Sequence, residues 1–335
     1  DLVFAGHSLI CENGVTLAES EPFATGLLFA DADARFLALE RRAINGFREE
    51  TREHLRVAFS QKMRALSLRR KVDPAPFVPG DPERLAERAE EILSIQAHAL
   101  ARRMRHTRAR RLVLGVSGGL DSTLALLVCV RALRIAGLAP DALTAITMPC
   151  FGTTSRTRSN AEVLAREVGA DFRQIDIQKA VLVHMQDIGL SPDDRSAAYE
   201  NAQARERTQV LMDIANAEGA LVVGTGDLSE SALGWATYNG DHMSMYGVNC
   251  SIPKTLIRHL VAYEAGRAQS EALKRALLDV LDTPVSPELL PPEDGQIAQK
   301  TEDLVGPYRL HDFFLYHTLR RHAAPGKVLR LARLA

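Results

Sequence analysis

The chain has 335 residues, of which 46% are apolar and 25% charged, and its 41 basic residues almost balance 42 acidic ones. This length suffices for one large domain or two modest ones, each with a core of its own. A net charge of -1 provides no global field that would attract nucleic acid or an anionic membrane. No apolar run approaches the roughly 20 residues of a membrane span. We therefore expect neither nucleic acid nor a membrane as a partner.

The cysteines give no sign of a metal site or a disulfide framework. Cys11, Cys129, Cys150 and Cys250 are scattered and form no CxxC pair, which is compatible with a reducing compartment, and we expect a cytoplasmic protein. The first residue is not Met, no signal-like region follows it, and the last residues read as an unfinished helix. We interpret the chain as a piece of a longer protein.

The first 82 residues predict a small β-rich part followed by a connector. Two apolar runs flank Asn13-Gly14, which predicts a β-hairpin over residues 8–18. Residues 35–68 are charged and predict helix. Residues 72–82 hold four prolines, which a helix or a central strand does not tolerate, so this stretch predicts a linker.

From residue 83 onward, short apolar strands alternate with helices. This alternation predicts a doubly wound parallel sheet with helices on both faces, an α/β fold. The predicted strands cover residues 111–116, 143–148, 172–177 and 221–224, and the predicted helices cover residues 83–104, 121–136, 160–168 and 200–217. Residues 282–308, rich in proline and acidic groups, predict a loop, and residues 309–335 predict helix. Ligands of such sheets bind beyond the carboxyl ends of the strands.

A basic run covers Arg102–Arg111. A solvated helix face followed by a loop is the favoured interpretation, and a phosphate- or RNA-binding patch is the alternative.

A glycine-rich turn between a predicted strand and a predicted helix is the sharpest motif. Adjacent glycines allow an anion to approach the backbone, and the helix that follows presents its free N–H groups and positive dipole end. The turn lacks the lysine of the GxxxxGK[ST] loop and so suits a pyrophosphate group. Its residues are Gly115, Val116, Ser117, Gly118, Gly119, Leu120, Asp121 and Ser122.

Asp121 allows two interpretations within this turn. It could cap the helix that begins there, or it could offer a hard oxygen ligand to Mg²⁺ beside the phosphates. Its place between SGG and Ser122 favours the metal ligand.

The segment SGGLDS resembles the signature of the ATP pyrophosphatases, the adenine nucleotide alpha hydrolase-like superfamily. The resemblance implies enzymes that split ATP between its α- and β-phosphates and transfer AMP to a substrate oxygen. Three further stretches narrow it: YENAQARER from Tyr199, GTGDLSE from Gly224, and LGWATYNGD from Leu233 with IPKT from Ile252. In this order and spacing they resemble glutamine-dependent NAD(+) synthetases, over roughly residues 85–320.

The resemblance implies an ATP site that includes the glycine-rich turn, Thr225 and Lys254, with Asp121 and Glu230 at Mg²⁺. Thr225 and Glu230 follow a predicted strand, so they can face the same crevice as Ser117. A helix N-terminal acid is the alternative for Glu230, and a surface lysine is the alternative for Lys254.

The resemblance also implies contacts with deamido-NAD, whose nicotinate end would meet the chain's single tryptophan. Asn201 and Arg205 lie four residues apart and share a helix face; a surface amide and a solvated arginine are the alternatives. A core tryptophan is the alternative for Trp235. The implied contacts are Asn201, Arg205, Glu230, Trp235, Ala236, Thr237 and Tyr238.

The implied reaction amidates deamido-NAD to NAD through an acyl-adenylate and releases AMP and pyrophosphate. Such chemistry depends on positioning and charge neutralisation, so we assign no side-chain nucleophile. The expected alternatives are another ATP pyrophosphatase, such as a GMP synthetase or a tRNA-modifying synthetase, and an inactive nucleotide-binding fragment.

Residues 1–45 resemble the end of a nitrilase-like glutaminase domain, which would supply ammonia from glutamine. Its catalytic Glu, Lys and Cys would precede this chain, and Cys11 does not match the nucleophile. We expect a glutaminase remnant over residues 1–45, a connector over 46–82 and a synthetase domain over 83–335 that continues beyond this chain. The family also leads us to expect association of copies into a homo-oligomer.

Overall fold

The computed structural model describes residues 2–44, 67–284 and 301–335, together with residues 46, 55, 57–60, 62 and 289. They form two compact units, Asp1–Pro74 with Phe313–Ala335, and Ala75–Asp312. The expected domain ranges were drawn from family resemblance and from the prolines of the linker, and a division into compact units does not test them. They stay a prediction.

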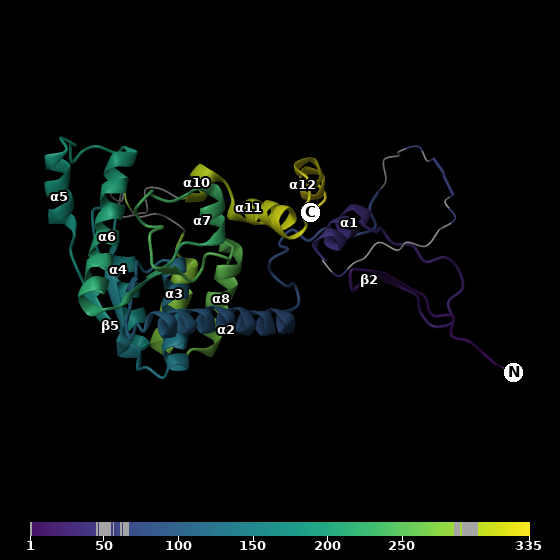
Figure 1. Ribbon diagram of the computed structural model, residues 1–335, viewed down its shortest axis with the longest axis horizontal. Coiled ribbons are helices and arrows are strands. Elements are labelled where there is room, and N and C mark those ends of the chain that lie inside the picture. The colour runs from purple at the N-terminus through teal and green to yellow at the C-terminus, as the bar shows by residue number, and fades with distance from the viewer. Residues whose placement is uncertain are drawn as a thin grey trace. The chain divides into compact units, whose positions relative to one another are not determined.

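The larger unit contains a five-stranded parallel sheet with the order β5-β4-β3-β6-β7. Figure 1 shows the helices around this sheet, with β5 labelled. The strand order runs outward in opposite directions from β3 and β6, so the topological switch point lies between these two strands. The predicted doubly wound sheet is confirmed. Its strands are β3 (Leu112–Gly115), β4 (Leu143–Thr147), β5 (Asp171–Gln174), β6 (Leu221–Gly224) and β7 (Tyr246–Gly247).

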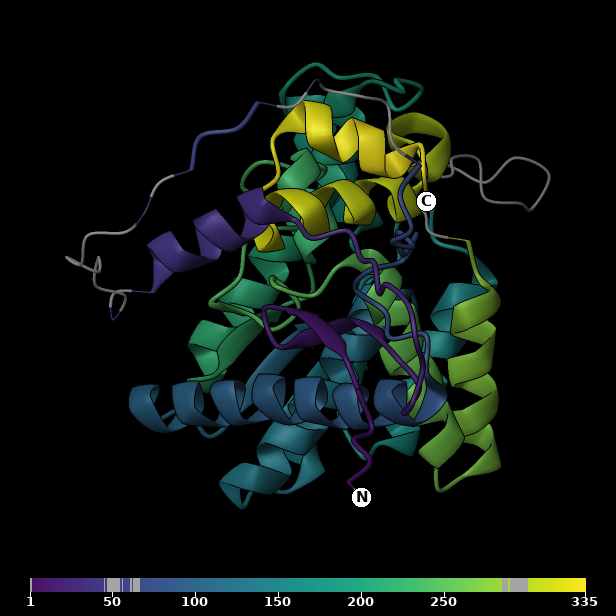
Figure 2. The same cartoon turned by 90° about the vertical axis from the view of Figure 1, so that its right-hand side faces the viewer.

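Continuous apolar strands explain why helices cover both faces of the sheet. In β3, Leu112 and Leu114 pack into one core cluster and Val113 packs into the other, as alternation along a strand requires. Helices that share the first core cluster form one layer, which we call the first layer: α2 (Pro82–Thr107), α3 (Leu120–Ala136), α4 (Ser155–Glu167), α8 (Lys254–Arg267) and α9 (Glu271–Asp282). Figure 2 shows α2 as the long blue helix. The second layer comprises α5 (Gln178–Asp187) and α6 (Ala197–Glu218).

Two helices of the first layer, α2 and α4, begin at side-chain caps. The Asp81 carboxylate accepts hydrogen bonds from the N–H groups of Glu83 and Arg84, and Pro82 occupies the first turn of α2, which suits proline because that N–H has no partner in the helix. The Thr154 hydroxyl accepts from the N–H of Thr157, so α4 begins at Ser155. The predicted start at residue 160 was therefore five residues late.

The smaller unit confirms the predicted hairpin. Strands β1 (Leu9–Glu12) and β2 (Val15–Glu19) pair antiparallel, and Asn13 and Gly14 have φ values of 46° and 81°, which a two-residue hairpin turn requires. The predicted helix over residues 309–335 is interrupted. It comprises α11 (Tyr308–Leu315), the π-helical turn η2 (Tyr316–Arg320) and α12 (Pro325–Ala332).

The predicted helix over residues 35–68 is confirmed only at its start. Among the described residues of this stretch, α1 (Ala34–Ala43) is the one helix, and it buries a single large side chain, Phe36. A helix with so little apolar surface to bury gains little from packing. Residues 45, 47–54, 56, 61 and 63–66 lie outside the described residues, as do 285–288 and 290–300 of the predicted acidic loop. That loop ends in a short helix, α10 (Thr301–Val305).

None of the helices within the described residues combines the length and the apolar character needed to cross a bilayer.

Candidate active site

The predicted site residues converge at the switch point of the sheet. The glycine-rich turn leads from β3 into α3, and residues 225–227 lead from β6 into α7 (Leu228–Leu233). Because β3 and β6 are neighbours and parallel, both connections leave the same edge of the sheet. This is where doubly wound sheets bind their ligands.

The turn at Ser117 is shaped for close approach of an anion. Gly118 has a φ of 81°, and a Cβ on it would lie 2.1 Å from the carbonyl oxygen of Thr157, so only glycine fits. Helix α3 begins after Gly119 without a side-chain cap. The hydroxyls of Ser117 and Ser122 lie 3.1 Å apart and line the turn. The first N–H groups of α3 and its positive dipole end therefore face the turn.

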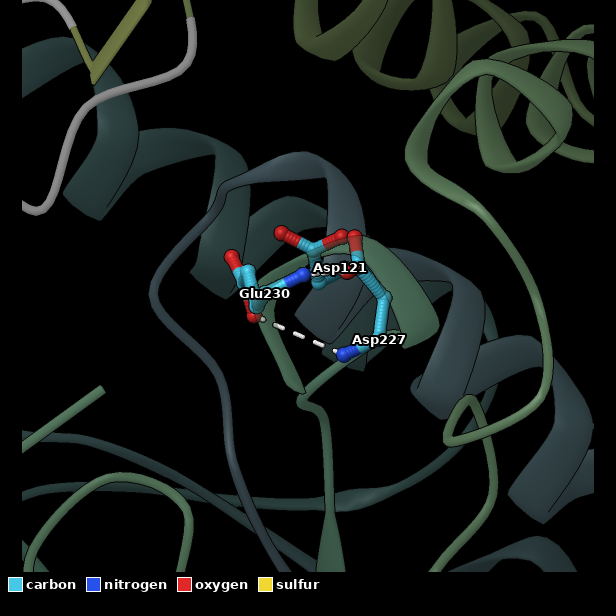
Figure 3. A group of neighbouring side chains, drawn as sticks. All are labelled: Asp121, Asp227 and Glu230. Atoms are coloured by element: carbon cyan, nitrogen blue, oxygen red, sulfur yellow. Dashed lines mark hydrogen bonds between the residues drawn. The ribbon is translucent and has the colours of Figure 1, made fainter. Parts of the chain in front are cut away.

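A buried lysine joins three carboxylates beside this turn. The Lys254 Nζ lies 2.7 Å from Asp121 Oδ2 and 2.8 Å from both Asp227 Oδ2 and Glu230 Oε1. Figure 3 shows the three carboxylates gathered at one point. The Lys254 side chain is only 3% exposed, so the surface-lysine alternative is wrong. The capping alternative for Asp121 is also wrong, because Gly119 occupies the cap position and Asp121 faces the lysine.

Burial and mutual repulsion set the protonation of this cluster. Burial raises the pKa of Glu230 to about 8, with the charge of Asp121 adding to the rise and Lys254 opposing it. Burial likewise raises the pKa of Asp227 to about 6, against the lowering effect of Lys254. Burial would lower the pKa of Lys254, but the three carboxylates raise it well above its ordinary value. Lys254 therefore stays charged, whereas a pKa of about 8 leaves Glu230 largely protonated at pH 7. A bound cation would displace that proton.

The cluster fits a divalent cation. One ligand atom from each of Asp121, Asp227 and Glu230 lies within 4.8 Å of the others. Asp121 Oδ1 is buried without a hydrogen-bond partner among the described residues. Hard oxygen ligands with an excess of negative charge are what Mg²⁺ prefers.

Asp227 is the member of the cluster that the sequence did not single out. It caps α7 in a reciprocal arrangement: the N–H of Glu230 donates to Asp227 Oδ1 at 2.7 Å, and the N–H of Asp227 donates to Glu230 Oε2 at 3.4 Å. The acidic residue three positions before Glu230 is a capping-box signal that could have identified it. The alternative for Glu230, a helix N-terminal acid, is realised together with its contact to Lys254.

The buried carboxylate of Asp312, which lies outside the cluster, fixes the backbone at Lys254. The N–H of Lys254 donates to the Ser229 hydroxyl at 2.9 Å, and that hydroxyl donates to Asp312 Oδ1. The other oxygen of Asp312 accepts from the N–H and the hydroxyl of Thr255. The start of α8, and with it the lysine, is thereby held against α7 and α11.

The structure brings together the two stretches predicted to hold the dinucleotide. The Thr237 hydroxyl donates to Asn201 Oδ1 at 2.7 Å, and the Arg205 Nε donates to the carbonyl of Tyr238 at 3.2 Å. Asn201 and Arg205 thus lie on one face of α6, as predicted. Contact of these residues with a dinucleotide stays a prediction.

The loop of residues 235–238, which contacts Asn201 and Arg205 of α6, offers accessible aromatic surface. Tyr238 is 75% exposed, Ala236 is exposed, and Trp235 is partly exposed while Thr237 is buried. The core alternative for Trp235 is therefore wrong. Flat accessible side chains at this position could stack against an aromatic ring.

Solved structures share this fold. A structure of NMN synthetase from Francisella tularensis is 23% identical, covers 73% of this chain and 91% of that chain, and superposes with a TM-score of 0.58. A glutamine-dependent NAD+ synthetase from Acinetobacter baumannii in complex with ADP is 24% identical, covers 73% of this chain and 43% of that chain, and has a TM-score of 0.52. At these identities the likeness shows the fold alone.

Sequence comparisons identify the family. A family model described as NAD synthase matches residues 92–275. A glutamine-dependent NAD(+) synthetase from Mycobacterium leprae is 40% identical over 98% of this chain and 51% of its own length. An NH(3)-dependent NAD(+) synthetase from Hyperthermus butylicus is 33% identical over 68% of this chain and 74% of its own length. The chain spans about half the length of two glutamine-dependent relatives that it matches at 40% identity. It belongs to the NAD synthase family.

Proposed function

We propose that the protein to which this chain belongs converts deamido-NAD to NAD with ATP and ammonia, releasing AMP and pyrophosphate. The observation that carries this proposal is the convergence of the uncapped start of α3 and the Lys254 cluster on one edge of the sheet. The relatives named NAD(+) synthetase support the same reaction. Membership of the NAD synthase family favours it over the other ATP pyrophosphatases considered from the sequence.

The first step activates the nicotinate carboxylate. A carboxylate oxygen attacks the α-phosphorus of ATP, the bond from that phosphorus to the bridging oxygen breaks, and pyrophosphate leaves. The Ser117 turn and the first N–H groups of α3 bind the β- and γ-phosphates, and the Lys254 ammonium offsets the charge that develops on the leaving group. Asp121 and Glu230, with Asp227, would hold Mg²⁺, which when bound supplies positive charge beside the phosphates.

The second step forms the amide. Ammonia attacks the carbonyl carbon of the acyl-adenylate, the carbon–oxygen bond to AMP breaks, and a proton is released. Thr225 contacts ATP in this proposal. Asn201, Arg205 and the loop from Trp235 to Tyr238 hold the dinucleotide, so the protein acts by positioning rather than as a nucleophile. Ammonia comes from glutamine through the nitrilase-like domain that residues 1–45 resemble.

Product analysis tests the proposal. The intact protein is incubated with ATP, Mg²⁺, ammonium and deamido-NAD, and the nucleotides are separated by chromatography. We expect NAD, AMP and pyrophosphate in equal amounts, and no AMP when deamido-NAD is left out. Formation of ADP in place of AMP would refute the mechanism.

A further inference from the structure

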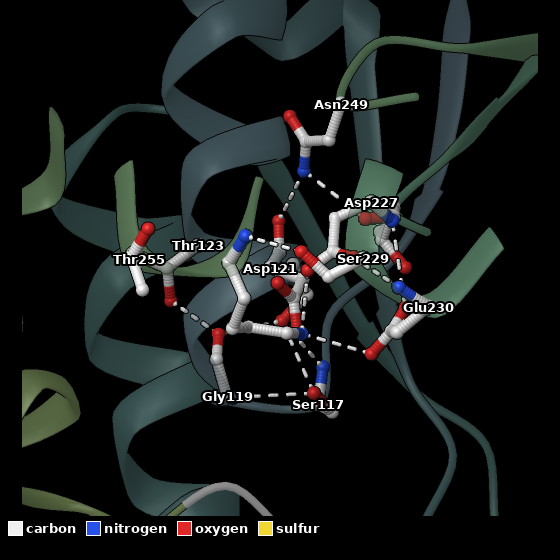
Figure 4. A network of polar contacts seen from close by, with 12 residues as sticks. Ser117, Gly119, Asp121, Thr123, Asp227, Ser229, Glu230, Asn249 and Thr255 are labelled. Carbon is white, nitrogen blue, oxygen red and sulfur yellow. Dashed lines mark hydrogen bonds and ion pairs between the residues drawn. The ribbon is translucent and has the colours of Figure 1, made fainter. Parts of the chain in front are cut away.

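One buried amide side chain joins the two loops that form the site. Asn249 is 0% exposed and follows β7. Its Nδ2 donates to the backbone carbonyl of Asp121 at 3.0 Å and to that of Thr225 at 3.1 Å. Figure 4 shows the two hydrogen bonds leaving this amide nitrogen. Asp121 lies in the first turn of α3, just after the connection from β3, and Thr225 lies in the connection after β6, so a single side chain spans the switch point.

The other end of this side chain is held from a helix. The Gln96 Nε2 on α2 donates to Asn249 Oδ1 at 3.2 Å and to the carbonyl of Val248 at 2.8 Å. Both amide hydrogens and the carbonyl oxygen of Asn249 are thereby engaged. Because Gln96 is itself buried, water does not compete for these bonds, and the orientation of the Asn249 amide is fixed.

We propose that Asn249 is a positioning residue for the nucleotide and its metal ion. This inference rests on the proposed function and adds a residue that contacts neither substrate. By holding the carbonyls of Asp121 and Thr225 to one nitrogen, Asn249 fixes the separation between the turn that binds the phosphates and the loop that carries Asp227 and Glu230. The carboxylates and Lys254 then converge without rearrangement when the nucleotide arrives, and such preorganisation is sensitive to shifts of about 1 Å.

The test compares two buried asparagines. Asn249→Leu keeps the approximate volume but removes both donors. Asn160→Leu is the matched control, because Asn160 is also buried and its Nδ2 donates to Asp279 Oδ2, which joins α4 to α9 and not the segments that carry Asp121 and Thr225. We expect both variants to melt at lower temperature, since each loses a buried hydrogen bond. Only Asn249→Leu should raise the half-saturating concentrations of Mg²⁺ and ATP, by about 10- to 100-fold.

A second variant covers the case in which Asn249→Leu does not fold. Gln96→Met leaves Asn249 in place but removes the hydrogen bond to its Oδ1, and it should shift Mg²⁺ and ATP dependence in the same direction by a smaller factor. Unchanged dependence in the folded variants, or an equal shift in Asn160→Leu, would overturn the inference.

A binding measurement separates this inference from the proposed function. Calorimetric titration of the intact protein and its variants with ATP and Mg²⁺, without deamido-NAD, reports nucleotide affinity whatever product forms later. A wild-type protein that binds MgATP but yields ADP would end the proposed reaction, while the difference between Asn249→Leu and Asn160→Leu would still decide the role of Asn249. A wild-type protein that does not bind MgATP would overturn both.

Discussion

At the residue scale, Asp121 combines two features that are rarely found together in a structural carboxylate. One oxygen contacts the buried Lys254, and the other is buried without a hydrogen-bond partner among the described residues. Asp121→Asn keeps the shape and removes the charge. We predict that pyrophosphate release falls by about 100-fold or more while the circular dichroism spectrum is unchanged. Asp141→Asn, at an exposed position, is the control. Wild-type turnover in Asp121→Asn would remove this residue from the site.

Gly118 tests the shape of the turn. Gly118→Ala combines a left-handed backbone with a Cβ 2.1 Å from the carbonyl oxygen of Thr157, whereas Gly137→Ala at the other end of α3 has a similar φ and meets nothing within 4 Å. The control should lose about 1–2 kcal/mol of stability and keep ATP binding. Gly118→Ala should lose more stability and also ATP binding, as measured by thermal melting with and without MgATP. Equal behaviour of the two variants would contradict this shape.

Local motifs in the sequence identified only part of the site. The glycine-rich turn, Asp121 and Glu230 could be predicted because each motif lies within a few residues of the strand it follows. Lys254 was named, but its burial was not evident from its neighbours. Asn249 could not be found, because its partners are 24, 128 and 153 residues away along the chain. Contacts of that kind exist only once the sheet has brought its strand ends together.

At the element scale, Glu218 ties together the amino ends of three strands. It accepts from Arg111 at 3.1 Å, from Arg173 at 2.5 Å and from Thr144 at 3.2 Å. Burial alone would raise the pKa of Glu218, but the hydrogen bond and charge of Arg173, with Thr144 and Arg111, hold it below its ordinary 4.5. The stabilisation is therefore complete above pH 4.5 and is lost as the pH falls through the lower folded-state pKa.

Glu218→Gln should accordingly lower the free energy of unfolding by about 1 kcal/mol at pH 7, and the difference from wild type should shrink in acid. Urea unfolding of wild type and Glu218→Gln, at pH 7 and again at a pH below the folded-state pKa of Glu218, measures this difference in stability. Glu162→Gln, which breaks an exposed pair with Arg166 within α4, should change stability by only a few tenths of a kcal/mol. If Glu218→Gln loses as much free energy of unfolding in acid as at pH 7, the charged form of Glu218 does not stabilise the fold.

The success of element prediction followed the amount of apolar surface that each element buries. Strands β3, β4 and β6 and helix α3 are almost wholly buried, and their apolar runs predicted them. Strand β7 has only two residues, too few for a periodic pattern, and it was not predicted. Of the helix expected over residues 35–68, the described residues form only α1, which buries a single large side chain, since charge suggested helix where little apolar surface supports one.

At the scale of the whole molecule, the chain spans about half the length of the glutamine-dependent relatives that it matches. The supply of ammonia and the association of copies stay predictions that rest on resemblance, and the cytoplasmic location stays a prediction that rests on the scattered cysteines. The α/β class and the doubly wound parallel sheet could be anticipated from the alternation of strands and helices, but the order of the strands was not predicted. The division into units could not, because the grouping of Phe313–Ala335 with Asp1–Pro74 depends on contacts between opposite ends of the chain.

Isotope transfer tests most directly whether the carboxylate attacks the α-phosphorus. Deamido-NAD carrying ¹⁸O in both nicotinate carboxylate oxygens is converted by the intact protein with ATP, Mg²⁺ and ammonium, and the products are analysed by mass spectrometry. Attack at the α-phosphorus predicts one ¹⁸O in AMP, one in the amide of NAD and none in pyrophosphate. Label in the phosphate or pyrophosphate released from the distal end of ATP, with none in AMP, would contradict the proposed chemistry.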